Sequence, residues 1–389
     1  MTPDRRTFLA AAAAGLVCPA LARAQSAGAV FRPEDFGAKG DGVTNDTAAF
    51  ARLSAAVTRR GGGTIALAPK RTYLVGAQRR DISLFTWGPV PIIELDGLSG
   101  PLTILGNGAR LRCAPGLRFG VFDPATGEPL HRKLPNTDHN GLASPYRALI
   151  HVSNCRGPVE VRDVELDGNL ERLRIGGQFG DGGWQVPATG LVFEGNLAEE
   201  IVANVYTHHH GQDGAMIIGL PRRAGRSRIS RLISRYNARQ GLSLTGGHGY
   251  DFADCEFSHT GRSAIMSPPG AGVDIEAEAN PIRDVTFARC KFIDNSGVGM
   301  VADSGDSEGG RFADCLFVGT TTWSAWPYKP GFRFARCTFV GSVVHPFSSR
   351  DAAKATRFLQ CRFTDNPRLS PTGKVFTNDG PIVNMGESD

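Results

Sequence analysis

A short pattern of apolar and polar residues recurs along the second half of the chain. Each copy begins with Phe, carries Cys at its fourth position and ends with Phe. The five copies are Phe252–Phe257, Phe287–Phe292, Phe312–Phe317, Phe334–Phe339 and Phe358–Phe363. Because the side chains of a strand alternate between its two faces, Cys and the second Phe share a face. The pattern therefore predicts a strand that ends at the first Phe, a tight corner, and a new strand that begins at Cys.

Looser aliphatic versions of this hexad precede the five Phe copies, and they begin at Val161, Ile201 and Ile229. The first residues of successive copies lie 22 to 40 positions apart. A period of this length, built from short strands, is typical of stacked units that bury their apolar faces against their neighbours. We therefore predict an all-β fold, a single right-handed parallel β-helix over residues 25–389.

A second type of strand lies between the hexads and begins with Gly. Its members are Gly190–Glu194, Gly214–Ile218, Gly241–Thr245, Gly272–Glu276 and Gly297–Val301. The second and fourth residues of each are apolar and are expected to point inward, so the third and fifth point outward. Only one of these strands has acidic residues at both outward positions. These residues, Asp274 and Glu276, are our candidate catalytic pair, with Glu278 next in phase.

Two long insertions lead into Gly strands and are expected to wall one side of the sheet that bears the acids. One takes fifteen residues from Phe257 to Gly272, and the other runs from residue 166 to residue 190. Long loops on a rigid scaffold are where binding residues concentrate. The second insertion contains Arg172 and Trp184, which are candidates for substrate binding, although Trp184 would equally suit packing within its own loop.

Further candidates lie at the starts of the Gly strands, at the edge of the expected groove. Asp213 is a third carboxylate or simply a turn residue before Gly214. The run His208–His210 suggests a solvated turn rather than a metal site, because consecutive side chains point in different directions, and we retain only His210 as an acid/base or substrate-binding group. The remaining candidates for substrate binding are Arg239, Gln240 and Glu194.

The start of the chain outside the repeats carries a family resemblance. Residues 33–75 include Asp35-Phe36-Gly37, then Gly40-Asp41-Gly42, and then Asn45-Asp46-Thr47. This segment resembles the opening of the pectate-lyase superfamily β-helix domain found in rhamnogalacturonase- and epimerase-like proteins. The resemblance implies an extracytoplasmic, carbohydrate-active protein. The polygalacturonase-like branch carries a Gly-His-Gly and an Arg-Ile-Lys; the chain has His248 between two glycines, in an expected turn, and no Arg-Ile-Lys.

The same segment predicts a short helix over residues 46–58 that covers the open end of the stack. Phe50, Leu53 and Val57 would share its apolar face, and Asn45 and Asp46 would cap its start. Without such a cover, the first coil would expose unpaired strand edges.

Three interpretations of the candidate site stay open at this stage. In the first, Asp274 and Glu276 are the acid/base pair of a glycoside hydrolase or glycosyl-transferring enzyme, with Asp213 as third carboxylate. In the second, these acids hold Ca²⁺ and Arg239 removes the α-proton of a uronate, which leads to a polysaccharide lyase or C5-epimerase. In the third, the protein binds a glycan or plays a structural role without catalysis. The first needs no cofactor.

The remaining features concern location and redox state. Arg5-Arg6, an apolar run and the Ala22-Arg23-Ala24 site predict a twin-arginine signal peptide over residues 1–24, so we expect the Tat export machinery as a partner and a periplasmic or secreted protein. No stretch is apolar enough to span a membrane, and the net charge of +5 is too small to indicate nucleic acid binding. The hexad cysteines are expected to form a buried, reduced ladder.

Overall fold

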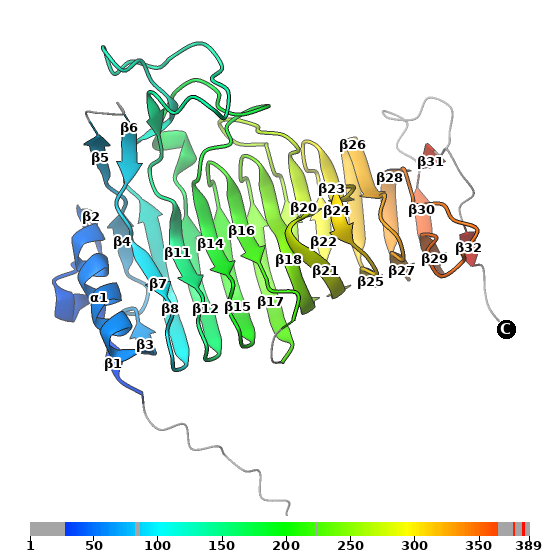
Figure 1. The fold of residues 1–389 in the computed structure, drawn as a ribbon, viewed down its shortest axis with the longest axis horizontal. Helices are drawn as coiled ribbons and strands as arrows, with labels where there is room; N and C mark the ends of the chain where they lie inside the picture. Colours follow the sequence, from blue (N-terminus) through cyan, green and yellow to red (C-terminus); the bar gives the residue numbers. More distant parts are fainter. Residues whose placement is uncertain (1–27, 82–85, 223–224, 365–375, 378–382, 386–389) are drawn as a thin grey trace, which may run out of the picture.

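Each coil of the chain contributes up to three strands, and each strand pairs in parallel with the equivalent strand of the next coil. The result is an elongated parallel β-helix, which confirms the fold class predicted from the repeats (Figure 1). The computed structural model describes residues 28–81, 86–222, 225–364, 376–377 and 383–385. The predicted signal peptide, residues 1–24, lies outside these ranges and stays a prediction.

The strands form three faces, numbered here in the order in which a coil passes through them. The first face contains β1 (Val30–Phe31), β3 (Gly63–Ala66), β21 (Ala277–Ala288), β25 (Arg311–Ala313), β27 (Arg333–Ala335), β29 (Arg357–Leu359) and β32 (Val383–Met385). The second face contains β2 (Asp41–Asn45), β4 (Thr72–Val75), β19 (Glu256–Ser258), β22 (Lys291–Ile293) and β30 (Arg362–Thr364). Four long strands bend from the first face to the second: β8 (Leu102–Cys113), β12 (Val159–Asp167), β15 (Glu200–His208) and β17 (Ser227–Arg235).

The third face carries the Gly strands and is the one that matters for function. It contains β7 (Ile93–Asp96), β11 (Ala148–Ser153), β14 (Thr189–Glu194), β16 (Asp213–Ile218), β20 (Ala271–Ile275) and β23 (Val298–Ala302). The first half of β18 (Gln240–Ala253) lies here, as do the second halves of β26 (Leu316–Pro327) and β28 (Thr338–Val344); β31 (Phe376–Thr377) pairs with β28. The short strand β24 (Gly305–Ser307) pairs with the start of β21.

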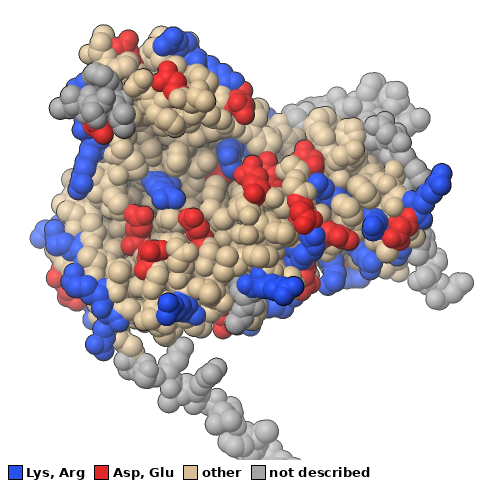
Figure 2. All heavy atoms as spheres, in the orientation of Figure 1, with Lys and Arg blue, Asp and Glu red and all other residues tan. Residues whose placement is uncertain are grey.

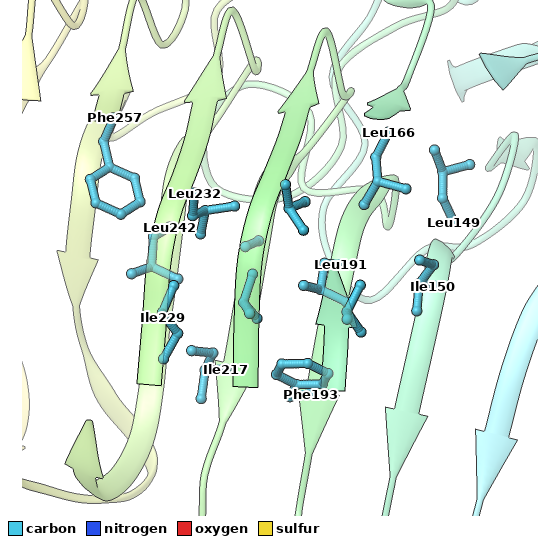
Figure 3. Packing of buried hydrophobic residues seen from close by; sticks show 14 of the residues in the cluster. Leu149, Ile150, Leu166, Leu191, Phe193, Ile217, Ile229, Leu232, Leu242 and Phe257 are labelled. Carbon is cyan, nitrogen blue, oxygen red and sulfur yellow. The ribbon is translucent and has the colours of Figure 1, made fainter. Parts of the chain in front are cut away.

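Equivalent side chains of successive coils stack inside the helix, as the hexad pattern predicts. The first Phe of each hexad forms one ladder, in which the rings of Phe252 and Phe287 are 4.5 Å apart at 8°. The last Phe forms a second ladder, in which Phe292 and Phe317 are 4.5 Å apart at 3°. Aliphatic side chains fill the same interior in the earlier coils (Figure 3).

The corner before each cysteine is a residue with left-handed backbone. Asp254, with φ of 55°, separates β18 from β19, and Arg289, with φ of 54°, separates β21 from β22. The hexad cysteines follow these corners and line the interior beside the Phe ladders, and all described cysteines are free thiols. The predicted buried ladder is thus confirmed, with Cys361 less buried than the other four, and no disulfide joins the described cysteines.

A helix covers the first coils, as predicted. The helix α1 (Thr47–Arg60) buries Phe50, Leu53 and Val57 completely. Its capping differs from the prediction, because Asp46 makes no side-chain bond to the helix and accepts from the Lys39 and Gly40 amides instead. The side chain of Asn45 accepts from the Thr47 amide. A 3₁₀ turn, η1 (Pro33–Phe36), packs beside the helix.

A lobe of long loops projects from the β-helix along the edge where the second face turns into the third (Figure 1). It contains a small sheet of β5 (Gln78–Asp81), β6 (Thr86–Pro89), β9 (Arg118–Val121), β10 (Leu142–Ala143) and β13 (Arg174–Ile175), with the 3₁₀ turn η2 (Leu170–Arg172). Every contributing loop joins a second-face strand to the next third-face strand. The lobe therefore overhangs the starting ends of the third-face strands. In the described ranges, no helix is long and apolar enough to cross a membrane.

Candidate active site

The predicted acid pair lies on the third face, at the finishing end of the strand β20. Asp274 is in β20, where its register partners are Ser243 of β18 and Val301 of β23. Only 2% of Asp274 is exposed, whereas Glu276, one residue past the end of β20, is half-buried. The two acids are thus at different depths, with Asp274 beneath and Glu276 at the surface.

Asp274 has one satisfied and one unsatisfied oxygen. The side-chain amide of Gln240, at the start of the neighbouring strand β18, donates to Oδ2 of Asp274. Oδ1 of Asp274 is buried and has no hydrogen-bond partner. A buried carboxylate oxygen without a partner costs free energy unless it carries a proton or gains a donor from a ligand.

Burial and crowding both favour the protonated forms of these acids. The pKa of Asp274 lies well above its usual range, first because of burial and next because of the neighbouring carboxylate of Glu276. The pKa of Glu276 is also raised, by burial and then by the charge of Glu278. Raised carboxyl pKa values are a property of proton-donating acids, and they cluster at functional sites.

An ion pair stands beside the acids. Nε of Arg239 donates to Oδ1 of Asp213 at 3.0 Å, and a terminal guanidinium nitrogen donates to Oδ2 at 3.2 Å. Asp213 is fully buried, and 16% of the Arg239 side chain is exposed. Burial raises the pKa of Asp213, and the charge of Arg239 offsets part of that effect. Asp213 therefore holds Arg239 in place rather than facing the groove.

The geometry does not suit Arg239 as a base. The charges of Asp213, Asp274 and Glu276 oppose the effect of burial and leave the pKa of Arg239 above its ordinary value. A guanidinium in this environment stays protonated, so it can neutralise charge or donate hydrogen bonds but cannot remove a proton. The lyase interpretation, in which Arg239 removes the α-proton, needs a neutral guanidine, which this environment disfavours.

Sequence reasoning missed one acid at this site. Asp303 lies two residues beyond Val301, just as Glu276 lies two residues beyond Asp274, the register partner of Val301. Its charge raises the pKa of both Asp274 and Glu276, and its side chain is exposed. Asp303 is the next outward position after Val301 in the alternation of the Gly297–Val301 strand, so following that alternation two residues further would have identified it. Figure 2 shows acidic side chains gathered beside basic ones in the hollow beneath the lobe.

The two predicted insertions do meet above the third face. The amide of Trp184 donates to Oγ of Ser267, which joins the loop before β14 to the loop before β20. The indole nitrogen of Trp184 donates to the Gly176 carbonyl, and its ring packs on the core. Trp184 is thus engaged mainly within its own lobe, which is the packing alternative considered above.

Arg172 lies away from the acid pair. It is exposed at the end of η2 and lines a cavity of about 260 Å³ together with Asp167, His208 and His209. This cavity is next to the second face, whereas Asp274 is on the third. The structure does not bring Arg172 to the candidate site.

His210 is a structural residue, contrary to the prediction. It is fully buried, its Nδ1 lies 2.9 Å from the Tyr146 hydroxyl, and its Nε2 lies 3.1 Å from the Leu166 carbonyl. Burial lowers the pKa of His210 well below its ordinary value. The left-handed backbone of His209, with φ of 54°, reverses the direction of the chain, and His210 consequently faces inward. His210 therefore cannot touch a substrate in the groove.

Glu194 belongs to a separate cluster on the same face. Its Oε2 lies 3.0 Å from Nε2 of His151 and 3.8 Å from the guanidinium of Arg147. The strands β16 and β18 separate β14 from β20, so Glu194 is roughly 14 Å from Asp274 along the axis.

His248 lies within β18, opposite Arg283, rather than in the turn that we expected.

The carboxylates do not form the ligand set that calcium prefers. Both oxygens of Asp213 accept from Arg239, and Oδ2 of Asp274 accepts from Gln240. Calcium takes six to eight oxygen ligands, mostly from several carboxylates and carbonyls. Across the part of the chain that the structure describes, no group of three or more His, Cys, Asp or Glu side chains is arranged to hold a metal ion.

The chain is similar to several solved structures at low sequence identity. The chain is similar to the ORF18 protein of Geobacillus virus E2, with 14% identity and a TM-score of 0.54 over 92% of this chain, and it spans 61% of that protein. It also aligns with pectate lyase Pel9A (13% identity, TM-score 0.46, 92% of this chain and 81% of that one). A third is the endo-xylogalacturonan hydrolase of Aspergillus tubingensis (12% identity, TM-score 0.41, 92% of this chain and 100% of that one).

No protein-family model and no curated protein sequence matches the chain. Among these likenesses, the one to the Geobacillus virus protein supports the parallel β-helix architecture, and at this identity it supports the fold alone. Because this fold hosts several chemistries, the function has to be argued from the site itself.

Proposed function

We propose that the protein is a carbohydrate-active enzyme that cleaves or transfers glycosidic bonds of a polysaccharide at the site formed by Asp274, Glu276 and Asp303. The observation that carries the proposal is the placement of these acids at different depths beside the fixed cation Arg239, with the pKa values of Asp274 and Glu276 raised. Two carboxyl groups of unequal protonation are what glycosidic bond cleavage requires.

The depth of the acids assigns their roles. Glu276 is half-buried at the surface of the third face, and burial and the charge of Glu278 raise its pKa, so it donates the proton to the leaving oxygen. Asp303 is exposed one coil further on and supplies the second carboxyl group, which stabilises positive charge on the sugar or activates water. Asp274 lies beneath them, where its interaction with Glu276 favours a proton shared by the pair, so Asp274 is a positioning residue.

The charge of the site favours this reaction over proton abstraction from a uronate. The transition state of glycosidic cleavage carries positive charge on the sugar, which nearby carboxylates stabilise. A uronate substrate is negatively charged, and the acids of this site would repel it. Arg239 is already engaged by Asp213, so only part of its charge is available to a uronate.

The lyase or epimerase reaction remains the second candidate, and one experiment separates the two. Purified protein is incubated with a panel of neutral and uronate-containing polysaccharides, with and without EDTA, while reducing ends and the absorbance of unsaturated uronate are followed. The proposal expects reducing ends without unsaturated uronate, and no effect of EDTA. Unsaturated uronate, or new uronate epimers without new ends, would overturn it.

The proposal extends to where the protein acts. The predicted twin-arginine signal would carry the folded protein to the periplasm or beyond, where polysaccharides are accessible. Fractionation of cells that express the full chain tests this prediction: removal of residues 1–24 should leave the protein in the cytoplasm.

A further inference from the structure

Aromatic side chains gather on the third face beyond the candidate site. Trp323 and Trp326 lie in the second half of β26, Tyr328 follows it, and His345 follows β28. Trp323 is 40% exposed and Tyr328 is 53% exposed. Among the described residues, no other Phe, Tyr or Trp is as exposed. Exposed aromatic rings next to each other are uncommon on a surface that has no binding role.

The register of the sheet connects this cluster to the acids. Asp274 pairs with Val301, and Val301 pairs with Trp326. Trp326 is therefore two coils from Asp274 along the axis, or roughly 10 Å. A glycan that lies along the third face with one unit at Glu276 would reach the aromatic cluster with a nearby unit.

Trp326, at the centre of the cluster, is held by the scaffold. The rings of Trp323 and Trp326 are 5.1 Å apart at 82°, and Trp326 lies 4.8 Å from His345. Trp326 also packs on a small cluster of Ala271, Val298 and Val301, which is separate from the main core. The indole nitrogen of Trp326 is buried without a partner. Rings fixed in this way lose little conformational entropy when they bind a ligand.

From this arrangement we infer that the aromatic cluster is a sugar-binding subsite on the C-terminal side of the acids, in which Trp323 stacks on one pyranose ring of the polysaccharide and Tyr328, at the other end of the cluster, contacts a neighbouring unit. A pyranose ring has an apolar face of C–H groups, which an exposed indole or phenol ring can cover while the hydroxyl groups stay in water. The inference deepens the proposed function and rests on it, because it assigns the direction in which the substrate extends from Glu276.

The test measures binding to the Asp274→Asn protein, in which loss of the carboxyl group beside Glu276 is expected to slow turnover. This protein is run in native gels that contain the polysaccharide of the panel that gives reducing ends, with polygalacturonate and xylan for comparison, and the retardation gives a dissociation constant for each polymer. Trp323→Ala and Tyr328→Ala are then added singly to this background. Leu197→Ala is the matched control, because Leu197 is 48% exposed in the turn after β14 and outside the cluster.

We expect Trp323→Ala to weaken binding of the retained polymer roughly tenfold and Tyr328→Ala to weaken it less, since stacking contributes on the order of 1 kcal/mol. Trp323→Phe should recover most of the loss, and Leu197→Ala should change nothing. With Asp274 intact, Trp323→Ala should raise KM for long chains and leave kcat unchanged.

The outcomes separate the inference from the proposed function. If the polymer binds the Asp274→Asn protein but Trp323→Ala and Tyr328→Ala bind it equally well, the subsite is wrong and the acid site is unaffected. If the polysaccharide that gives reducing ends with wild type does not retard the Asp274→Asn protein, the subsite is contradicted and the proposed function stands. If no polysaccharide of the panel gives reducing ends, the proposed function is contradicted, and the subsite with it.

Discussion

Asp274 combines two properties that a solvated surface acid does not have. It is almost fully buried, and one of its oxygens has no partner. Burial of an unpaired carboxylate destabilises the folded state whenever the group is ionised. Such a residue persists in a protein when its function outweighs its cost to stability.

The cost of ionising the buried carboxyl group of Asp274 predicts a pH-dependent gain in stability for Asp274→Asn. Because the folded-state pKa of Asp274 is raised, its stabilising contribution is present below the ordinary carboxyl pKa and is lost as pH rises through the raised value. The Asn variant keeps an oxygen that can accept from Gln240 and has no charge to lose. Its Tm should match or fall below wild type near pH 3.5 and exceed wild type by several degrees near pH 8. An equal Tm difference at both pH values would contradict the account.

The buried pair of Asp213 and Arg239 predicts strong coupling. Arg239→Ala leaves Asp213 ionised and unpaired in the interior, which should lower the free energy of unfolding by about 3 kcal/mol. The double variant Asp213→Asn/Arg239→Gln removes both charges and should recover much of that loss. Chemical denaturation of Asp213→Asn, Arg239→Gln and the double variant measures the coupling. Strictly additive losses would show that the pair is not coupled.

At the scale of elements, the hexads determine where thiols lie. The thiols of Cys315 and Cys337 stack between the Phe ladders, and their pKa values are raised to about 12, first by the neighbouring thiol of the ladder. Native protein at pH 8 should therefore react with a disulfide reagent very slowly, because only the thiolate attacks. Denatured protein should release all of its thiols without reductant. Rapid labelling of native protein, or missing thiols after denaturation, would contradict the ladder.

The strands could be predicted from sequence because the hexads repeat both the apolar positions and the corner residues. The acids of the site followed from the same alternation: Asp274 and Glu276 lie where the Gly-strand phase puts them. His210 was misassigned because a left-handed backbone at His209 changes which side chain faces inward, and alternation alone does not reveal this.

Two other parts of the site could not be predicted from the sequence, for physical reasons. Asp303 lies beyond the end of β23, where strand alternation was not followed. Trp323 and Trp326 lie in a strand whose register shifts twice against β28, so no regular repeat marks them as neighbours of Asp274. The pairing of Arg239 with Asp213 joins adjacent coils, and only the register of β16 with β18 brings them together.

At the scale of the whole molecule, the helix α1 protects the open end of the stack. Phe50, Leu53 and Val57 bury their side chains against the first coils, and β3 and β4 would be exposed without them. Removal of all residues before Gly61 should therefore cause concentration-dependent association, because exposed strand ends pair with other chains. Sedimentation velocity compares the truncated protein with one that starts at residue 28. A truncated protein that stays monomeric would contradict the capping role.

The central claim is that Glu276, with Asp274 beneath it and Asp303 beside it, performs acid/base catalysis on a glycan. The most direct measurement is kcat/KM as a function of pH for wild type, Glu276→Gln and the matched control Glu278→Gln, on the polysaccharide that gives reducing ends. The account predicts a loss of about 10²- to 10⁴-fold for Glu276→Gln, at least half of wild-type activity for Glu278→Gln, and a wild-type rate that falls as pH rises through the raised pKa of Glu276. Wild-type activity in the Glu276→Gln variant, with its fold intact by circular dichroism, would contradict the claim.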